Sequence, residues 1–103
     1  MWAQLISMRL KEGKEGDLPR LYEQLRAAEQ PDTGLLRTMA LRDDKDPRRI
    51  YNIVFFDSED QARQRERDPR REEKLQTARA TMAEIFEGPP EFVDLTVIED
   101  TSY

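Results

Sequence analysis

The stretch that decides the fold covers residues 49–58 and reads Arg49-Ile50-Tyr51-Asn52-Ile53-Val54-Phe55-Phe56-Asp57-Ser58. This pattern predicts a strand that is apolar on both faces and leads directly into a helix start. Such a strand has to be covered on two sides. The helices of a 103-residue chain can cover one side, and we expect a second copy of the chain to cover the other. The sequence therefore predicts an obligate homodimer.

Length and charge set the next limits. A chain of 103 residues, 38% of them charged, predicts a single domain over residues 1–103 with a thin core. Its formal net charge of -5 argues against binding to a phosphate backbone. The first ten residues contain no apolar stretch long enough for a signal peptide or a membrane span. We therefore expect a cytoplasmic protein that has neither nucleic acid nor a membrane as a partner.

The chain contains no cysteine and no histidine. It therefore has no disulfides, no thiolate nucleophile, no imidazole base and none of the usual zinc, copper or haem ligands. Asp43, Asp44 and Asp46 lack the glycine-centred loop and the later glutamate of a calcium site, so we interpret them as an acidic hairpin turn. We expect no metal and no cofactor.

Hydrophobic periodicity predicts the remaining elements. Strands are expected over residues 2–10, 35–42 and 91–99 in addition to the one at 49–58. One amphipathic helix is expected between an N-cap at Asp17 and Gln30. A short polar helix is expected to begin at Ser58, and a longer one at Asp68-Pro69 that ends at Gly88-Pro89-Pro90. This order predicts an α+β, ferredoxin-like fold, an antiparallel four-stranded sheet with helices on one face.

Five features of the chain together resemble the antibiotic biosynthesis monooxygenase-like family of dimeric α+β barrels: the segment Leu10 to Glu15, the turn from Pro31 to Gly34, the strand end Phe56-Asp57-Ser58, Asp68-Pro69, and Glu87 to Pro90. The resemblance implies a dimeric barrel of two facing sheets, with a small cavity between the sheet and the helices of each subunit. It also implies a range of activities, from cofactor-free oxidation of aromatic polyketides to haem degradation. A fold shared by such different activities does not identify the function.

The resemblance implies a candidate site on the third strand. The cofactor-free oxygenases of this family hold a phenolic substrate with an asparagine and with a tryptophan four residues later, and this chain has Asn52 and Phe56 at that spacing. Asn52 is the catalytic candidate, because a buried amide can donate a hydrogen bond to a developing oxyanion. Phe56 would shape the substrate pocket without the indole N–H. The alternative is that Asn52 pairs with a neighbouring strand and Phe56 fills the core.

Tyr22, Tyr51 and Arg79 are the other polar residues that could face a cavity, and of these Tyr22 and Arg79 are the candidates for binding a substrate. A tyrosine can donate a hydrogen bond, and an arginine can hold a carboxylate or a phenolate. The alternative is that Tyr22 packs with its hydroxyl at the rim and that Arg79 is solvated. The arginines of residues 63–71 alternate with acidic residues, which is typical of a solvated helical face.

Two functions stay open at this point. One is a cofactor-independent monooxygenase that oxidises a small aromatic or polyketide-type substrate. The other is a non-catalytic dimer module that binds a small apolar or aromatic ligand or serves a structural role. Haem binding is not expected, because the histidine ligand of the haem-degrading branch is missing.

Overall fold

A computed structural model of the chain describes all residues, 1–103. Its elements are the strands β1 (Trp2–Leu10), β2 (Leu35–Arg42), β3 (Arg49–Phe56) and β4 (Phe86–Thr96), the short 3-10 helix η1 (Glu15–Asp17), and the helices α1 (Leu18–Ala28), α2 (Glu59–Glu66) and α3 (Pro69–Ile85). The strands form one antiparallel sheet in the order β2-β3-β1-β4. The predicted ferredoxin-like α+β fold is therefore confirmed.

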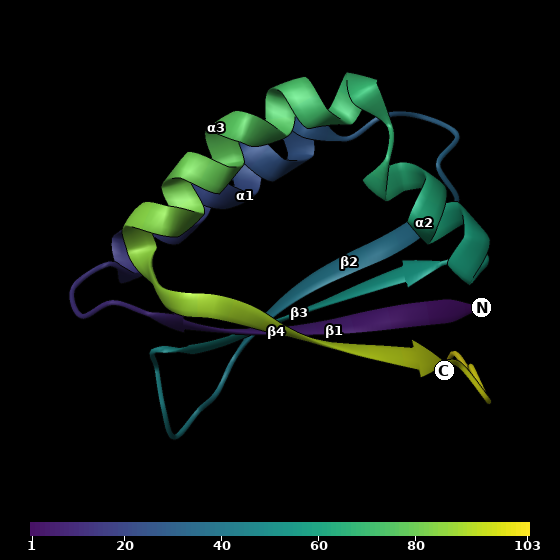
Figure 1. Cartoon of the computed structure of the whole chain (residues 1–103). Coiled ribbons are helices and arrows are strands. Elements are labelled where there is room, and N and C mark those ends of the chain that lie inside the picture. Colours follow the sequence, from purple (N-terminus) through teal and green to yellow (C-terminus); the bar gives the residue numbers. More distant parts are fainter.

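The helices lie on one face of this sheet. Figure 1 shows α1 and α3 side by side over the strands, with α2 at the end of the sheet where both chain termini lie. The main core joins β1 and β3 to both long helices, and it includes Leu10, Leu21, Ile50, Ala78 and Ile85. A second, smaller cluster consists of Trp2, Phe56 and Ala62. None of the helices is both long and apolar enough to cross a membrane.

Two helix starts form as their sequences predict. The backbone N–H of Gln61 donates to the Ser58 hydroxyl at 3.3 Å, and the N–H of Arg70 donates to the Asp68 carboxylate at 2.9 Å. Asp17 precedes α1, but its side chain makes no capping bond and accepts from Arg20 instead. The capping prediction is thus confirmed for α2 and α3 and wrong for the side chain of Asp17.

The end of the last helix differs from the sequence prediction. α3 ends at Ile85, and Gly88-Pro89-Pro90 lies inside β4, which starts and ends several residues earlier than expected. β4 is an edge strand, so its prolines need no ladder partner for the N–H that they lack. The register against β1 shifts between Ser7 and Arg9, and this bulge accommodates the extra residues around Gly88, whose φ is +67°.

The turn before β2 depends on a glycine. Gly34 has a φ of +78°, and a Cβ atom at this position would lie 2.5 Å from the Gln61 side chain. Gln61 belongs to the first turn of α2. The missing side chain therefore lets α2 pack closely against the start of β2.

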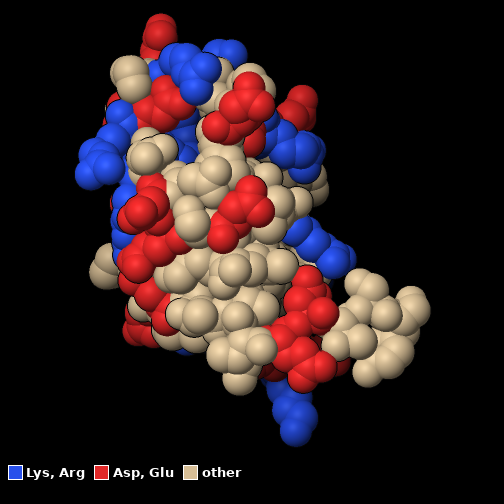
Figure 2. All heavy atoms as spheres, turned by 90° about the vertical axis from the view of Figure 1, so that its right-hand side faces the viewer, with Lys and Arg blue, Asp and Glu red and all other residues tan.

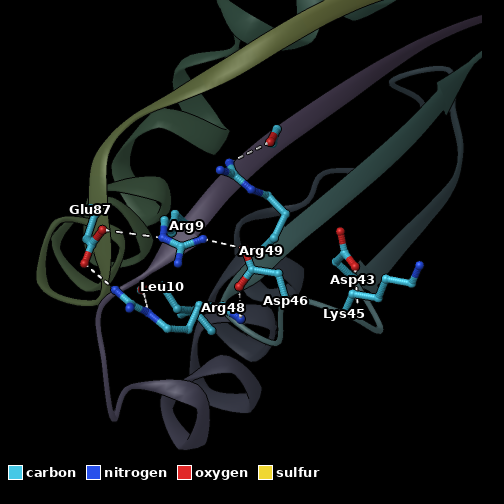
Figure 3. A network of polar contacts seen from close by, with 9 residues as sticks. Arg9, Leu10, Asp43, Lys45, Asp46, Arg48, Arg49 and Glu87 are labelled. Atoms are coloured by element: carbon cyan, nitrogen blue, oxygen red, sulfur yellow. Dashed lines mark hydrogen bonds and ion pairs between the residues drawn. The ribbon is translucent and has the colours of Figure 1, made fainter.

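The hairpin between β2 and β3 is held by ion pairs at the end of the sheet opposite the termini. Figure 3 shows Arg9 between Asp46 and Glu87, and Arg48 between the Leu10 carbonyl and Glu87. Asp43 accepts from the backbone N–H of Lys45 at 2.8 Å. These carboxylates contact protein donors, as expected of an acidic hairpin turn.

Candidate functional site

A cavity of about 670 Å³ lies between the helices and the sheet face that they cover. It is bordered by all three residues of the smaller cluster and by Leu75 of the main core. Of its 21 lining residues, 12 are hydrophobic. A mostly apolar cavity of this size with a few polar groups is typical of a small-molecule site.

The cavity brings together the four candidate site residues: Asn52, Phe56, Tyr22 and Arg79 all line it. Tyr51 does not line it, because it alternates with Asn52 on β3 and lies on the opposite face of the sheet. A second hollow of about 310 Å³ borders α1 and the β2–β3 hairpin, and it shares Tyr22 but neither Asn52 nor Phe56. The larger cavity is therefore the candidate site.

Asn52 and Tyr22 form the polar centre of the cavity. Asn52 lies on β3 between Ile6 of β1 and Ala40 of β2, and strand alternation directs its side chain toward the helices. The Tyr22 hydroxyl, on α1, donates to Asn52 Oδ1 at 3.0 Å. Because the amide oxygen accepts this bond, the Nδ2 amide group keeps its donor capacity for a ligand.

Tyr22 is a neutral donor rather than a base. Burial raises the pKa of its hydroxyl above the usual 10.0, and the hydrogen bond to Asn52 offsets only part of that shift. The phenol therefore stays protonated at neutral pH. It orients Asn52 through its hydrogen bond and is not a base at that pH.

Phe56 and Trp2 form an aromatic wall at one end of the cavity. They are paired residues of β3 and β1, with ring centroids 6.1 Å apart, and their exposed fractions are 2% and 7%. Two arginines of α2 cover this wall: the guanidinium of Arg63 lies 5.2 Å from the Trp2 ring and that of Arg65 lies 5.5 Å from the Phe56 ring. Although Phe56 itself has no indole, one lies directly beside it on the neighbouring strand.

Arg79 stands at the rim of the cavity. Its side chain is exposed, and its guanidinium forms an ion pair with Glu72 on the same helix. This contact lowers the pKa of the Glu72 carboxyl. Arg79 therefore combines the two interpretations of the sequence, because it borders the cavity and is also solvated.

The arginines of α2 and α3 are only partly the solvated face that their sequence predicts. Figure 2 shows acidic and basic side chains mixed over the α2 side of the molecule, with uncharged atoms between them. Arg65 and Arg71, however, are half-buried and border the cavity. Arg65 donates two hydrogen bonds to Glu29 on α1, at 2.8 and 2.6 Å. Sequence reasoning missed these residues and Trp2, whose alternation on β1 was the only available signal.

The fold and the cavity place this chain among small α+β proteins that have a ligand-sized cavity between the helices and the sheet. The antibiotic biosynthesis monooxygenase family model matches residues 1–73. The chain therefore belongs to this family. No curated protein matches it by sequence.

Solved structures share the fold at low sequence identity. A protein of Nitrosomonas europaea that carries the same family description has a TM-score of 0.75 at 17% identity, over 96% of this chain and 100% of that one. SnoaB, a cofactor-independent oxygenase from Streptomyces nogalater, has a TM-score of 0.74 at 15% identity, over 96% and 94%. A MhuD variant with manganese protoporphyrin IX bound has a TM-score of 0.75 at 16% identity, over all of both chains.

Proposed function

We propose that the chain binds a small aromatic ligand in the cavity and that Asn52 donates a hydrogen bond to a phenolic or enolic oxygen of that ligand. The hydrogen bond from Tyr22 to Asn52 carries this proposal, because it fixes the amide inside an apolar cavity with its N–H donors available. Trp2 and Phe56 supply aromatic surface for the ring of the ligand.

The reaction that this site supports best is cofactor-independent oxygenation of an activated CH₂ group. An anthrone loses a proton to form a phenolate-like carbanion, which reduces O₂. One oxygen atom becomes a new ring carbonyl, and the other leaves as water with the two hydrogens of the CH₂ group. A donor aimed at the anionic oxygen would stabilise this charge as it develops. Membership of the family and the likeness to SnoaB support this reaction class.

The acid–base groups of the cavity favour a second candidate, a non-catalytic ligand binder. The two carboxylates that line it, Glu29 and Glu66, are paired with Arg65 and Arg63, and Tyr22 is a neutral donor. No free general base faces the ligand. Catalysis would therefore require a substrate that ionises readily by itself.

Aerobic oxidation of 1,8-dihydroxyanthrone separates the two candidates. The wild type is expected to exceed the buffer rate, and Asn52→Ala to lose about a hundredfold in kcat because one oxyanion donor is removed. Gln64→Ala, an exposed site on α2, is the matched control and should keep the full rate. A wild-type rate equal to the buffer rate, together with saturable quenching of Trp2 by the anthrone, would establish the binder instead.

Haem does not fit the cavity on chemical grounds. The chain has no histidine or cysteine for the iron, and the lining tyrosine hydroxyl is hydrogen-bonded to Asn52. We therefore propose that haem is not the ligand, although a structural neighbour binds a porphyrin. A saturable one-per-chain shift of the Soret band at micromolar haem would contradict this proposal.

The sheet face opposite the helices supports the proposal of a homodimer. Ile50 and Asn52 point toward the helices, so the alternating residue Ile53 points away from them, together with Leu5 and Val93 paired beside it. On the same face Leu41, Val93 and Leu95 are 42%, 48% and 41% exposed. We propose that a second copy of the chain covers this face, because the same apolar rows would then meet across a two-fold axis.

A further inference from the structure

One arginine in the wall of the cavity lacks a partner. Arg71, in the first turn of α3, is half-buried and lines the cavity, but its side chain makes no hydrogen bond and no ion pair. The other half-buried arginines all have side-chain partners: Arg9 with Asp46, Arg48 with Glu87, Arg49 with Ser7, Arg63 with Asp94, and Arg65 with Glu29. A desolvated charge without a partner reduces stability, so Arg71 requires another explanation.

The acidic groups around Arg71 are already engaged. Both carboxylate oxygens of Glu29 accept from Arg65, and Glu72 pairs with Arg79. Burial and the nearby Arg65 charge lower the pKa of Arg71, and the charges of Glu29 and Glu72 offset only part of this effect. The Arg71 guanidinium is therefore a charged group whose N–H donors have no acceptor within the protein.

The net charge of the residues that line the cavity is opposite in sign to the net charge of the whole chain. The formal net charge of the protein is -5, but four arginines and only two glutamates line the cavity. The rest of the lining is mostly apolar. Such a cavity is complementary to a molecule with an apolar body and a negative group at one end.

We propose that the ligand is an apolar aromatic molecule that carries a carboxylate, and that Arg71 binds this carboxylate through its guanidinium. The inference rests on the proposed function in one respect, that the same cavity holds the aromatic part of the ligand against Trp2 and Phe56. The planar guanidinium matches a carboxylate through two parallel N–H···O bonds. The carboxylate of the bound ligand then accepts the hydrogen bonds for which the chain itself provides no acceptor.

A pair of matched ligands tests this proposal. 3-Phenylpropanoate and 3-phenylpropanamide have the same aromatic body, but only the first carries a charge at neutral pH. Their binding is followed through Trp2, which is the only tryptophan and lines the cavity, with excitation at the red edge of indole absorption. The wild type is expected to bind the carboxylate about tenfold more tightly than the amide, since a hydrogen bond to a charged group is the stronger kind.

Three variants locate the origin of this preference. Arg71→Gln is expected to bind the carboxylate no better than the amide, with amide affinity unchanged within about twofold, and Arg71→Lys to keep part of the preference. Arg67→Gln is the matched control, because Arg67 is exposed and its side chain makes no hydrogen bond or ion pair, and it should keep the whole preference. Arg71→Gln should also unfold at no lower urea concentration than the wild type, since it removes an unpartnered charge.

Several results would overturn the inference. These are equal binding of the two ligands by the wild type, a preference that survives in Arg71→Gln, an equal loss in Arg67→Gln, or a marked loss of stability in Arg71→Gln that indicates a structural role. If 3-phenylpropanamide still binds in any of these cases, the proposed aromatic binding site stands and only the role of Arg71 is wrong. Absence of binding by both ligands would remove the proposed aromatic site together with the inference.

Discussion

At the scale of single residues, the proposed function depends on the contact between Tyr22 and Asn52. The tyrosine is far from the asparagine in sequence, and the hydrogen bond of 3.0 Å joins α1 to β3 inside the cavity. It fixes which side of the Asn52 amide faces the cavity. Tyr22 is thus a positioning residue that acts through Asn52.

Replacement Tyr22→Phe is expected to lower both stability and affinity. The Asn52 oxygen loses its donor, and because this site is half-buried we expect a loss of about 1 kcal/mol in the free energy of unfolding. The Asn52 side-chain amide is then free to rotate, so binding of a phenol should weaken. Binding of an apolar ring such as naphthalene should change little. Urea unfolding and Trp2 quenching measure the two effects.

Tyr51→Phe is the control for this variant. Tyr51 is half-buried like Tyr22 and lies on β3 beside Asn52, but on the opposite face of the sheet, and its hydroxyl makes no hydrogen bond within the chain. Equal changes in both variants would show that the loss comes from the missing hydroxyl group alone and not from the orientation of Asn52.

The sequence predicts some of these residues better than others. Strand alternation and the family resemblance lead to Asn52 and Phe56, because both depend on local spacing along β3. The position of Arg71 could not be predicted, because its alternating charge pattern is also that of a solvated helix. Whether Arg71 faces the cavity is determined by the angle at which α3 leaves α2, which no local pattern specifies.

At the scale of elements, α2 closes one end of the cavity. It is short and very polar, and only Ala62 among its residues is buried. Its position depends on the Ser58 cap, on packing against Gly34, and on the arginines that cover Trp2 and Phe56. A helix of this length has little stability by itself.

Loss of the Ser58 cap is therefore expected to affect the cavity as well as stability. Ser58→Ala should lower the free energy of unfolding by about 1 kcal/mol and increase hydrogen exchange in residues 59–66 above that in α1. Ser58→Asp keeps a side-chain acceptor and should behave as the wild type. Uniform exchange changes along the whole chain would contradict a local role for this cap.

The wrong helix end shows where element prediction fails. Gly88-Pro89-Pro90 is a strong stop signal in sequence, but the helix has already ended at Ile85 and the signal lies in an edge strand. An edge strand tolerates proline because one side of it needs no hydrogen bonds. This tertiary context determines the outcome, and the local pattern contains no information about it.

At the scale of the whole molecule, the bare sheet face is the most prominent feature. The apolar pattern on both faces of β3 predicts it correctly, since one face is covered by helices and the other is covered by nothing within the chain. The sequence cannot specify the geometry of the partner, because symmetry and crossing angle depend on the assembled surfaces.

Dimer formation is expected to depend on this face. Light scattering should give twice the chain mass of 12.2 kDa. Val93→Lys places an unpaired charge in the interface and should raise the dimer dissociation constant at least about a hundredfold. Ile98→Lys is the control, because Ile98 is 95% exposed and lies beyond β4. A folded wild-type particle with the mass of one chain would contradict the proposed dimer.

Chemical-shift mapping determines whether the cavity around Asn52 binds an aromatic molecule. Titration of ¹⁵N-labelled protein with 2-naphthol should give saturable shifts of the Asn52 side-chain amide and of the backbone amides of Trp2, Phe56 and Leu75. Residues on the opposite sheet face, such as Leu41 and Leu95, should stay unchanged. Shifts that do not saturate, or that are confined to that opposite face, would show that the cavity is not the binding site.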